Sequence, residues 1–199
     1  FKGMNQNHAL GVVFNNKGNI LKASNQLPES VAAYEKAITI ARRLLGKSQI
    51  QLQKAQIRAG ANSESAKIAN SINESSSKLE RYAITLANRL SNISLSHKEM
   101  ASFDKSLEVL QEAEDLVVEN DNLMSLLRVF GNRGLTLLGM NRENEAKELF
   151  DQSYGLAEAS FNDQKDMNTL QSYQFAAMNK ANFWKILALK EEPPNKDKL

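Results

Sequence analysis

Phe14-Asn15-Asn16-Lys17-Gly18-Asn19-Ile20-Leu21 and Phe130-Gly131-Asn132-Arg133-Gly134-Leu135-Thr136-Leu137 superpose without a gap, at an offset of 116 residues. The same offset relates the residues that follow, which are a small residue, an aromatic residue and a second small residue: Ser30, Tyr34 and Ala37 after the first stretch, and Ala146, Phe150 and Ser153 after the second. A pattern kept at a fixed offset indicates a structural repeat.

Each position of this pattern has a steric reason if every copy is a pair of packed helices. The glycine lets the first helix approach the second closely, and the small residues at 30 and 146 face it across the turn. We expect the aromatic residues at 34 and 150 to fill the gap between one pair and the next. Ser24-Asn25-Gln26-Leu27-Pro28 and Gly139-Met140-Asn141-Arg142-Glu143-Asn144 supply the turns.

The composition favours an all-helical protein that buries a core. The 199 residues have no proline between Pro28 and Pro193, and apolar residues recur at spacings of three and four. No apolar run reaches the ~18–20 residues that span a bilayer. The absence of cysteine excludes disulfides, thiolate metal sites and a cysteine nucleophile.

A third, weaker copy begins at Leu90, 40 residues before Phe130, and continues with Asn92, Ile93, Ser94, Ser106, Leu110 and Ala113. The whole pattern resembles the tetratricopeptide repeat, whose usual length is about 34 residues. The longer spacing is similar to that of kinesin light chains and of the Leu-Gly-Asn-repeat scaffolds of the mitotic spindle. The resemblance implies an all-α, right-handed α-solenoid of helical hairpins with about seven helices.

The interval between the first two copies predicts an elongated arm. Two three-four patterns, from Ile38 to Ala59 and from Ile68 to Leu86, flank a break at Gly60-Ala61-Asn62-Ser63. We therefore expect long helices over about 28–59 and 64–97 that form an antiparallel hairpin. Alternatively, a capping box at Ser77-Lys78-Leu79-Glu80 begins a new helix, and 47–76 is a separate inserted pair.

These elements form one domain over 1–191. Repeat 1 covers about 11–45, the arm about 46–76, repeat 2 about 77–120 and repeat 3 about 122–162. The joints after repeats 2 and 3 are expected at Asn120-Asp121-Asn122 and Asn162-Asp163. An amphipathic helix within about 164–191 carries a stripe from Leu170 to Leu187 that includes Trp184, and 192–199 is a disordered tail.

The residues that could indicate an enzyme or a cofactor site do not have the spacing that such sites require. Gly46-Lys47-Ser48 matches the end of a phosphate-binding loop, but Ala41 stands where its first glycine belongs. His8 and His97 lack carboxylates at metal-ligand spacing, and the acidic helix around Glu114 lacks a calcium loop. We predict no catalytic residue, no metal and no cofactor.

The candidate binding residues share a slot two positions before the repeat glycine, where Asn16, Asn92 and Asn132 stand and which Asn179 continues. One interpretation is an inter-helix hydrogen bond that fixes packing. The other is a ladder of carboxamides that bonds a partner's backbone, which the resemblance implies because first helices line the concave groove of these families. The same stripe includes Asn19, Lys22 and Arg128, the last matching a basic slot of the spindle scaffolds.

We therefore expect an intracellular, cytoplasmic adaptor or scaffold, cytoskeletal or ciliary settings included, that binds a protein or peptide segment and is no enzyme. Residues 1–60 hold nine Lys/Arg and two Asp/Glu, whereas residues 99–166 hold six Lys/Arg and fifteen Asp/Glu. This asymmetry indicates either solvated helix faces of opposite charge or a polarised groove. That acidic half argues against nucleic acid. Alternatives are a structural subunit that uses the arm, and a regulatory module of a larger protein, which the start at Phe1 permits.

Overall fold

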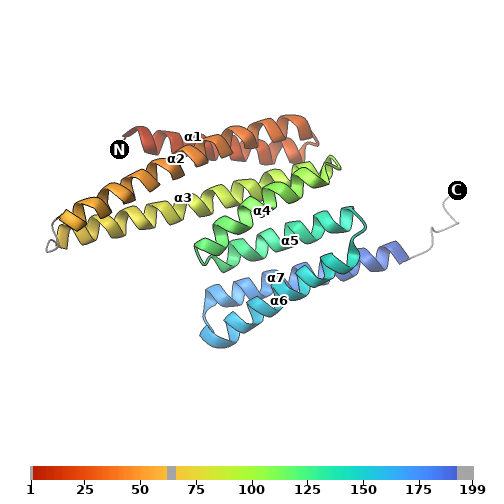
Figure 1. Ribbon diagram of the computed structural model, residues 1–199. Helices are drawn as coiled ribbons and strands as arrows, with labels where there is room; N and C mark the ends of the chain where they lie inside the picture. The colour runs from red at the N-terminus through yellow and green to blue at the C-terminus, as the bar shows by residue number, and fades with distance from the viewer. Residues whose placement is uncertain (1, 62–65, 192–199) are drawn as a thin grey trace. The chain divides into compact units, whose positions relative to one another are not determined.

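The computed structural model describes residues 2–61 and 66–191, and this part of the chain consists of helices joined by short turns (Figure 1). The helices are α1 (Lys2–Ala23), α2 (Leu27–Ala61), α3 (Ala66–Glu99), α4 (Phe103–Glu119), α5 (Leu123–Gly139), α6 (Glu143–Gln164) and α7 (Met167–Glu191). No strand occurs among the described residues. The all-α fold class and the seven helices are thus as predicted, while the tail at 192–199 and positions 62–63 of the predicted turn lie outside the described residues.

The chain divides into two compact units, residues 1–125 and residues 126–199. In the first unit α1 packs on α2, α2 on α3 and α3 on α4. In the second unit α6 packs on α7, and Gly134 of α5 lies against Phe150 of α6. Each unit therefore buries its core between neighbouring helices of the sequence.

The turn inside each helical pair is built in the same way three times. Asn25, Ala101 and Asn141 adopt left-handed backbone angles, with φ of 57°, 55° and 59°. The next residue then donates its backbone N–H to a carbonyl five positions earlier: Gln26 to Leu21 at 2.9 Å, Ser102 to His97 at 2.8 Å and Arg142 to Leu137 at 2.9 Å. Such bonds satisfy carbonyls that the end of a helix leaves unpaired, so the turn both stops the first helix and starts the second.

Glycine and aromatic residue meet within one helical pair. A Cβ at residue 18 would lie 2.6 Å from the Tyr34 ring, and a Cβ at residue 134 would lie 2.7 Å from the Phe150 ring. The sequence assigned both aromatics to the gap between pairs, and the ring of Tyr34 fills the space that Gly18 leaves within its own pair. Phe150 does both, since its ring centroid is also 5.2 Å from that of Phe183 on α7.

In the first two repeats the small residue faces the glycine position and adds a hydrogen bond, as expected for Ser30. Ser30 Oγ donates to the carbonyl of Gly18 at 3.1 Å, and Ser106 Oγ donates to the carbonyl of Ser94 at 2.9 Å. All of these serines are fully buried. Repeat 3 has Ala146 at this position, which is fully buried and has no hydroxyl to donate.

Helices α2 and α3 are the longest of the described helices, with 35 and 34 residues, and they pack side by side (Figure 1). Their adjoining ends extend beyond α1 and α4. Helix α3 is continuous through Ser77, so the alternative of a new helix starting there is wrong. Ser48 and Ala55 of α2 are buried, which shows that small residues form the seam of this hairpin.

The buried face of α7 differs from the predicted stripe. Thr169, Ser172, Ala176 and Phe183 are buried, whereas Trp184 is 48% exposed. The sequence reasoning placed the apolar stripe from Leu170 to Leu187 inward, but the buried face of α7 is rotated by about one residue from it. Trp184 instead contacts Phe183 edge-on at 5.1 Å.

Helix α6 continues to Gln164, beyond the joint expected at Asn162-Asp163. It ends where Lys165 adopts a left-handed φ of 51°. Asp166 then caps α7, because its Oδ1 accepts the backbone N–H of Thr169 at 2.8 Å. The hydrogen bonds from Thr169 lower the pKa of this aspartate, which keeps the cap ionised.

Candidate functional site

The first helices of repeats 1 and 2, α1 and α3, touch along one face of the first unit. Asn92 Nδ2 donates to Asn15 Oδ1 at 3.0 Å, and Lys22 Nζ lies 3.9 Å from a carboxylate oxygen of Glu99. Both pairs are separated by 77 residues, so α1 runs in register with the C-terminal half of α3. We call the surface around these contacts the first-helix face.

Three predicted binding residues lie on or beside the first-helix face in different environments. Asn16 is exposed, whereas Asn92 is half-buried and bonds to Asn15, the neighbour of Asn16. Asn19 accepts a 2.6 Å hydrogen bond from the hydroxyl of Tyr34, which ties its carboxamide to α2. The slot therefore holds one solvated carboxamide and one that joins two helices.

The second unit repeats this geometry. Asn179 of α7 places its Nδ2 only 2.8 Å from where a Cβ at Gly131 of α5 would stand. The same relation holds in both units. Asn92 of α3 reaches Asn15, the residue before Asn16, and Asn179 of α7 reaches Gly131, the residue before Asn132. Asn132 is itself half-buried, and its carbonyl accepts the hydroxyl of Thr136 at 2.9 Å. The carboxamides of Asn92 and Asn179 consequently have a packing role in addition to any role in binding.

The two basic candidates, Lys22 and Arg128, differ in their burial and in their contacts with other residues. Lys22 is half-buried beside Glu99, while Arg128 on α5 is exposed. Between the second helices, Arg42 of α2 makes a 2.6 Å ion pair with Glu112 of α4. Basic residues of the first helical pair and acidic residues of the next pair thus partly neutralise each other, at solvent-accessible positions where each ion pair contributes under about 1 kcal/mol.

Sequence reasoning missed a cationic cluster at the first-helix face. Arg89 of α3 is only 4% exposed and donates Nη1 to the backbone carbonyl of Ala37 at 2.6 Å. Burial lowers the pKa of its guanidinium. Burial and, after it, the charges of Arg89 and Arg81 lower the pKa of His8, so two guanidinium groups lie near this imidazole and favour its neutral form. The signal available in the sequence was Gly11, a helical glycine without a turn or cap to explain it.

The described residues contain no group of three or more His, Asp or Glu side chains arranged to hold a metal ion. Among the described helices, none has both the length and the apolar character required to cross a bilayer. The site therefore consists of carboxamides, cations and helix surface, which can bind a polypeptide through hydrogen bonds and charge.

Two segments of the chain match the sequence models of a known family. Residues 12–50 and residues 127–160 each match a tetratricopeptide repeat. None of the curated proteins compared with the chain matches it significantly. The matches cover the two helical pairs in which a glycine packs on an aromatic ring, α1–α2 and α5–α6. The recurring pair geometry and these matches together show that the chain contains tetratricopeptide repeats over residues 12–50 and 127–160.

Proposed function

We propose that this chain is an adaptor or scaffold domain without catalytic activity, and that its first-helix face binds a segment of a partner polypeptide. Tetratricopeptide repeats generally mediate protein–protein interactions, and their members are typically not enzymes. The observation that carries the proposal is the gathering of Asn15, Asn16 and Asn92 where α1 meets α3.

Carboxamides suit a surface that must bind a backbone. Each side chain offers two N–H donors and an oxygen acceptor, so Asn92 keeps further capacity after it donates one N–H to Asn15. Asn16 is exposed, and its carboxamide is the most accessible of the set. In the second unit we propose equivalent contacts from Arg128, Asn132 and Asn179 on the first helices α5 and α7.

Photocrosslinking tests where a partner lies. A photoreactive amino acid is introduced at Asn16 on the first-helix face or at Ile57 in the arm, and crosslinked proteins from native extract are identified by mass spectrometry. The proposal expects one protein to be captured at position 16 and to bind again when purified. Crosslinks confined to position 57 would contradict it.

Paired variants then separate binding from packing in the purified complex. Asn16→Ala removes an exposed carboxamide, whereas Asn15→Ala removes the inter-helix bond to Asn92. One carboxamide bond contributes about 0.5–1.5 kcal/mol, so Asn16→Ala should weaken binding by up to about tenfold with unchanged thermal stability. The triple change of Asn16, Asn92 and Asn132 should weaken it by one to three orders of magnitude, on the order of 1.4 kcal/mol per tenfold. Full affinity in a folded triple variant would exclude the first-helix face.

A second candidate function is that of a structural subunit that contacts its neighbours through the arm. Ile50 and Ile57 of α2 are 52% and 66% exposed and lie one heptad apart on the same side of the helix. Lys54 stands between them and is also exposed. Apolar residues on this side of the arm would suit an assembly contact, and the crosslinking position at Ile57 detects it.

A further inference from the structure

Arg89 presents an unusual energetic situation. Its side chain is 4% exposed, and its hydrogen bond is to a backbone carbonyl rather than to a carboxylate. Arginine stays protonated in proteins at neutral pH, so a positive charge is held out of water at this point. A buried charge without a counter-charge is costly. A group that supplies the negative charge would therefore be bound favourably.

The guanidinium packs against α1, in the space left by the missing side chain of Gly11. A Cβ at residue 11 would lie 2.6 Å from Nη2 and 2.8 Å from Nη1 of Arg89. Those distances are too short for a carbon–nitrogen contact, so a side chain at residue 11 would require the guanidinium to move. Gly11 is buried within a helix, where glycine is unfavourable by about 1 kcal/mol relative to alanine. The space for the guanidinium is thus kept although glycine lowers the stability of the helix.

Near Arg89 lie the imidazole of His8 on α1 and the guanidinium of Arg81 on α3. Among the described residues, no carboxylate contributes to the pKa shift of Arg89 or of His8. His8 Nδ1 is buried without a hydrogen-bond partner among the described residues. Tyr82 lies between these groups, 6.1 Å from the His8 ring and 5.3 Å from the Arg81 guanidinium.

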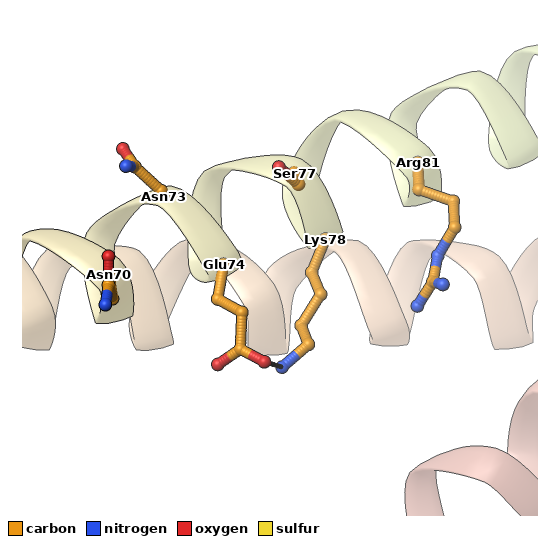
Figure 2. Close-up of a pocket in the computed structure, with 6 residues that line it drawn as sticks. All are labelled: Asn70, Asn73, Glu74, Ser77, Lys78 and Arg81. Carbon is orange, nitrogen blue, oxygen red and sulfur yellow. Dashed lines mark ion pairs between the residues drawn. The ribbon is translucent and has the colours of Figure 1, made fainter. Parts of the chain in front are cut away.

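A polar groove of about 480 Å³ runs along α3 and includes Arg81 of this cluster in its lining. Figure 2 shows Arg81 at one end of the groove and Asn70 at the other. Glu74 and Lys78 pair with each other at 3.8 Å, so Arg81 carries the unbalanced charge of the groove. The lining residues all come from α3 and present amides, a hydroxyl and charges: Asn70, Asn73, Glu74, Ser77, Lys78 and Arg81.

We propose that Arg89, together with His8 and Arg81, forms a subsite for a carboxylate side chain of the bound polypeptide, so that the partner segment is acidic where it crosses α1 and α3. The proposal rests on the proposed function and names the chemistry of its partner. A carboxylate is planar and can accept two parallel N–H bonds from a guanidinium. It is also small enough to approach an arginine that is nearly enclosed.

The test uses the whole chain and three probes: a capped hexaglutamate peptide, a capped hexaglutamine peptide and inorganic phosphate. The Nε–Hε signal of Arg89 and the ring signals of His8 are followed by nuclear magnetic resonance. Hexaglutamate should shift both signals and raise the pKa of His8, because a bound anion favours the protonated imidazole. Hexaglutamine should leave both unchanged. A stronger response to phosphate than to hexaglutamate would overturn the assignment to a carboxylate, and no response to either anion would overturn the subsite.

Matched variants separate the subsite from general attraction to a basic surface. Arg89→Met and the exposed Arg43→Met remove the same charge, and only the first should weaken hexaglutamate binding, by about tenfold to a hundredfold. Gly11→Ala should have a similar effect because its methyl group displaces the guanidinium. Gly46→Ala should have none, since nothing lies within 4 Å of a Cβ there. Equal losses in the two arginine variants would contradict the proposal.

A structural role for Arg89 gives another result. It predicts that Arg89→Met melts earlier and that its binding falls only as far as its folded fraction does, which circular dichroism on the same sample measures. Such a result would overturn the subsite. Failure of the proposed function is recognised separately, because hexaglutamate would still shift Arg89 while position 16 captures no partner.

Discussion

The close contact between Gly134 and Phe150 gives a sharp test of the repeat core. A Cβ at residue 134 would lie 2.7 Å from two atoms of the ring, well inside the ~3.5–4.0 Å at which carbon atoms pack best. Phe150 is fully buried and its ring also contacts Phe183, so it cannot swing aside. The added methyl group therefore requires the two helices to shift, an overpacking that typically costs about 1–3 kcal/mol.

Gly155 of α6 supplies the matched control for the substitution Gly134→Ala. Both glycines lie inside helices, so alanine gains about 1 kcal/mol of helix propensity at either position. Nothing lies within 4 Å of a Cβ at residue 155, so this gain should appear unopposed. The unfolding free energies of the two variants should therefore differ by about 1–3 kcal/mol, because the propensity term cancels.

Trp184 reports this difference locally. It is the single tryptophan of the chain, and its ring lies 5.1 Å from that of Phe183, which packs on Phe150. Urea unfolding followed by its fluorescence should give a lower midpoint for Gly134→Ala than for Gly155→Ala. Identical midpoints would mean that the glycine position does not hold the helices together, and the explanation of the repeat pattern would fail.

Three further changes test the turns, the buried hydroxyls and the histidines. Ala101→Gly should stabilise the first unit by about 0.5–1 kcal/mol, because alanine is strained at its φ of 55°, and the urea midpoint followed by circular dichroism measures the gain. Ser30→Ala should cost about 1 kcal/mol in the same assay through loss of the hydrogen bond to Gly18, and an unchanged midpoint would refute this. Burial and, after it, the charge of Lys105 lower the pKa of His97 below its usual 6.5. As the pH falls, His97 is therefore protonated more readily in the unfolded chain than in the folded one, and the stability of the fold decreases below about pH 6.5. His97→Gln should make the melting temperature less dependent on pH between about pH 7 and about pH 5.

The repeat frame was predictable because it depends on contacts between residues close in sequence. Gly18 and Tyr34, like Gly134 and Phe150, are separated by only 16 positions and meet inside one helical pair. The long helices were predictable for a similar reason, since a three-four pattern needs no knowledge of the neighbouring helix. Only the choice at Ser77 stayed open, because a capping box can also occur inside a continuous helix.

Contacts between different repeats were not predictable in the same way. The buried face of α7 depends on which residues permit close approach, and Phe183 rather than Trp184 meets Phe150. The repeat frame grouped the slot asparagines with one another, but the partner of Asn92 is Asn15 because the register between α1 and α3 is shifted by one residue from the frame. A one-residue shift between helices cannot be deduced from a repeat period alone.

The helical glycines connect these two classes of contact. Alanine is favoured over glycine inside a helix by about 1 kcal/mol, so a retained glycine suggests that something occupies the space of its Cβ. That space holds aromatic rings at Gly18 and Gly134, a guanidinium at Gly11 and a carboxamide at Gly131, and nothing within 4 Å at Gly46 and Gly155. The sequence spacing between glycine and aromatic residue identifies the contacts at Gly18 and Gly134, since both partners belong to one helical hairpin. The guanidinium contact joins residues 11 and 89, and Arg89 in the sequence is indistinguishable from an exposed basic residue such as Arg128. Burial of the charge, and with it the reason to expect an acidic partner, therefore arises only when α1 is placed against α3.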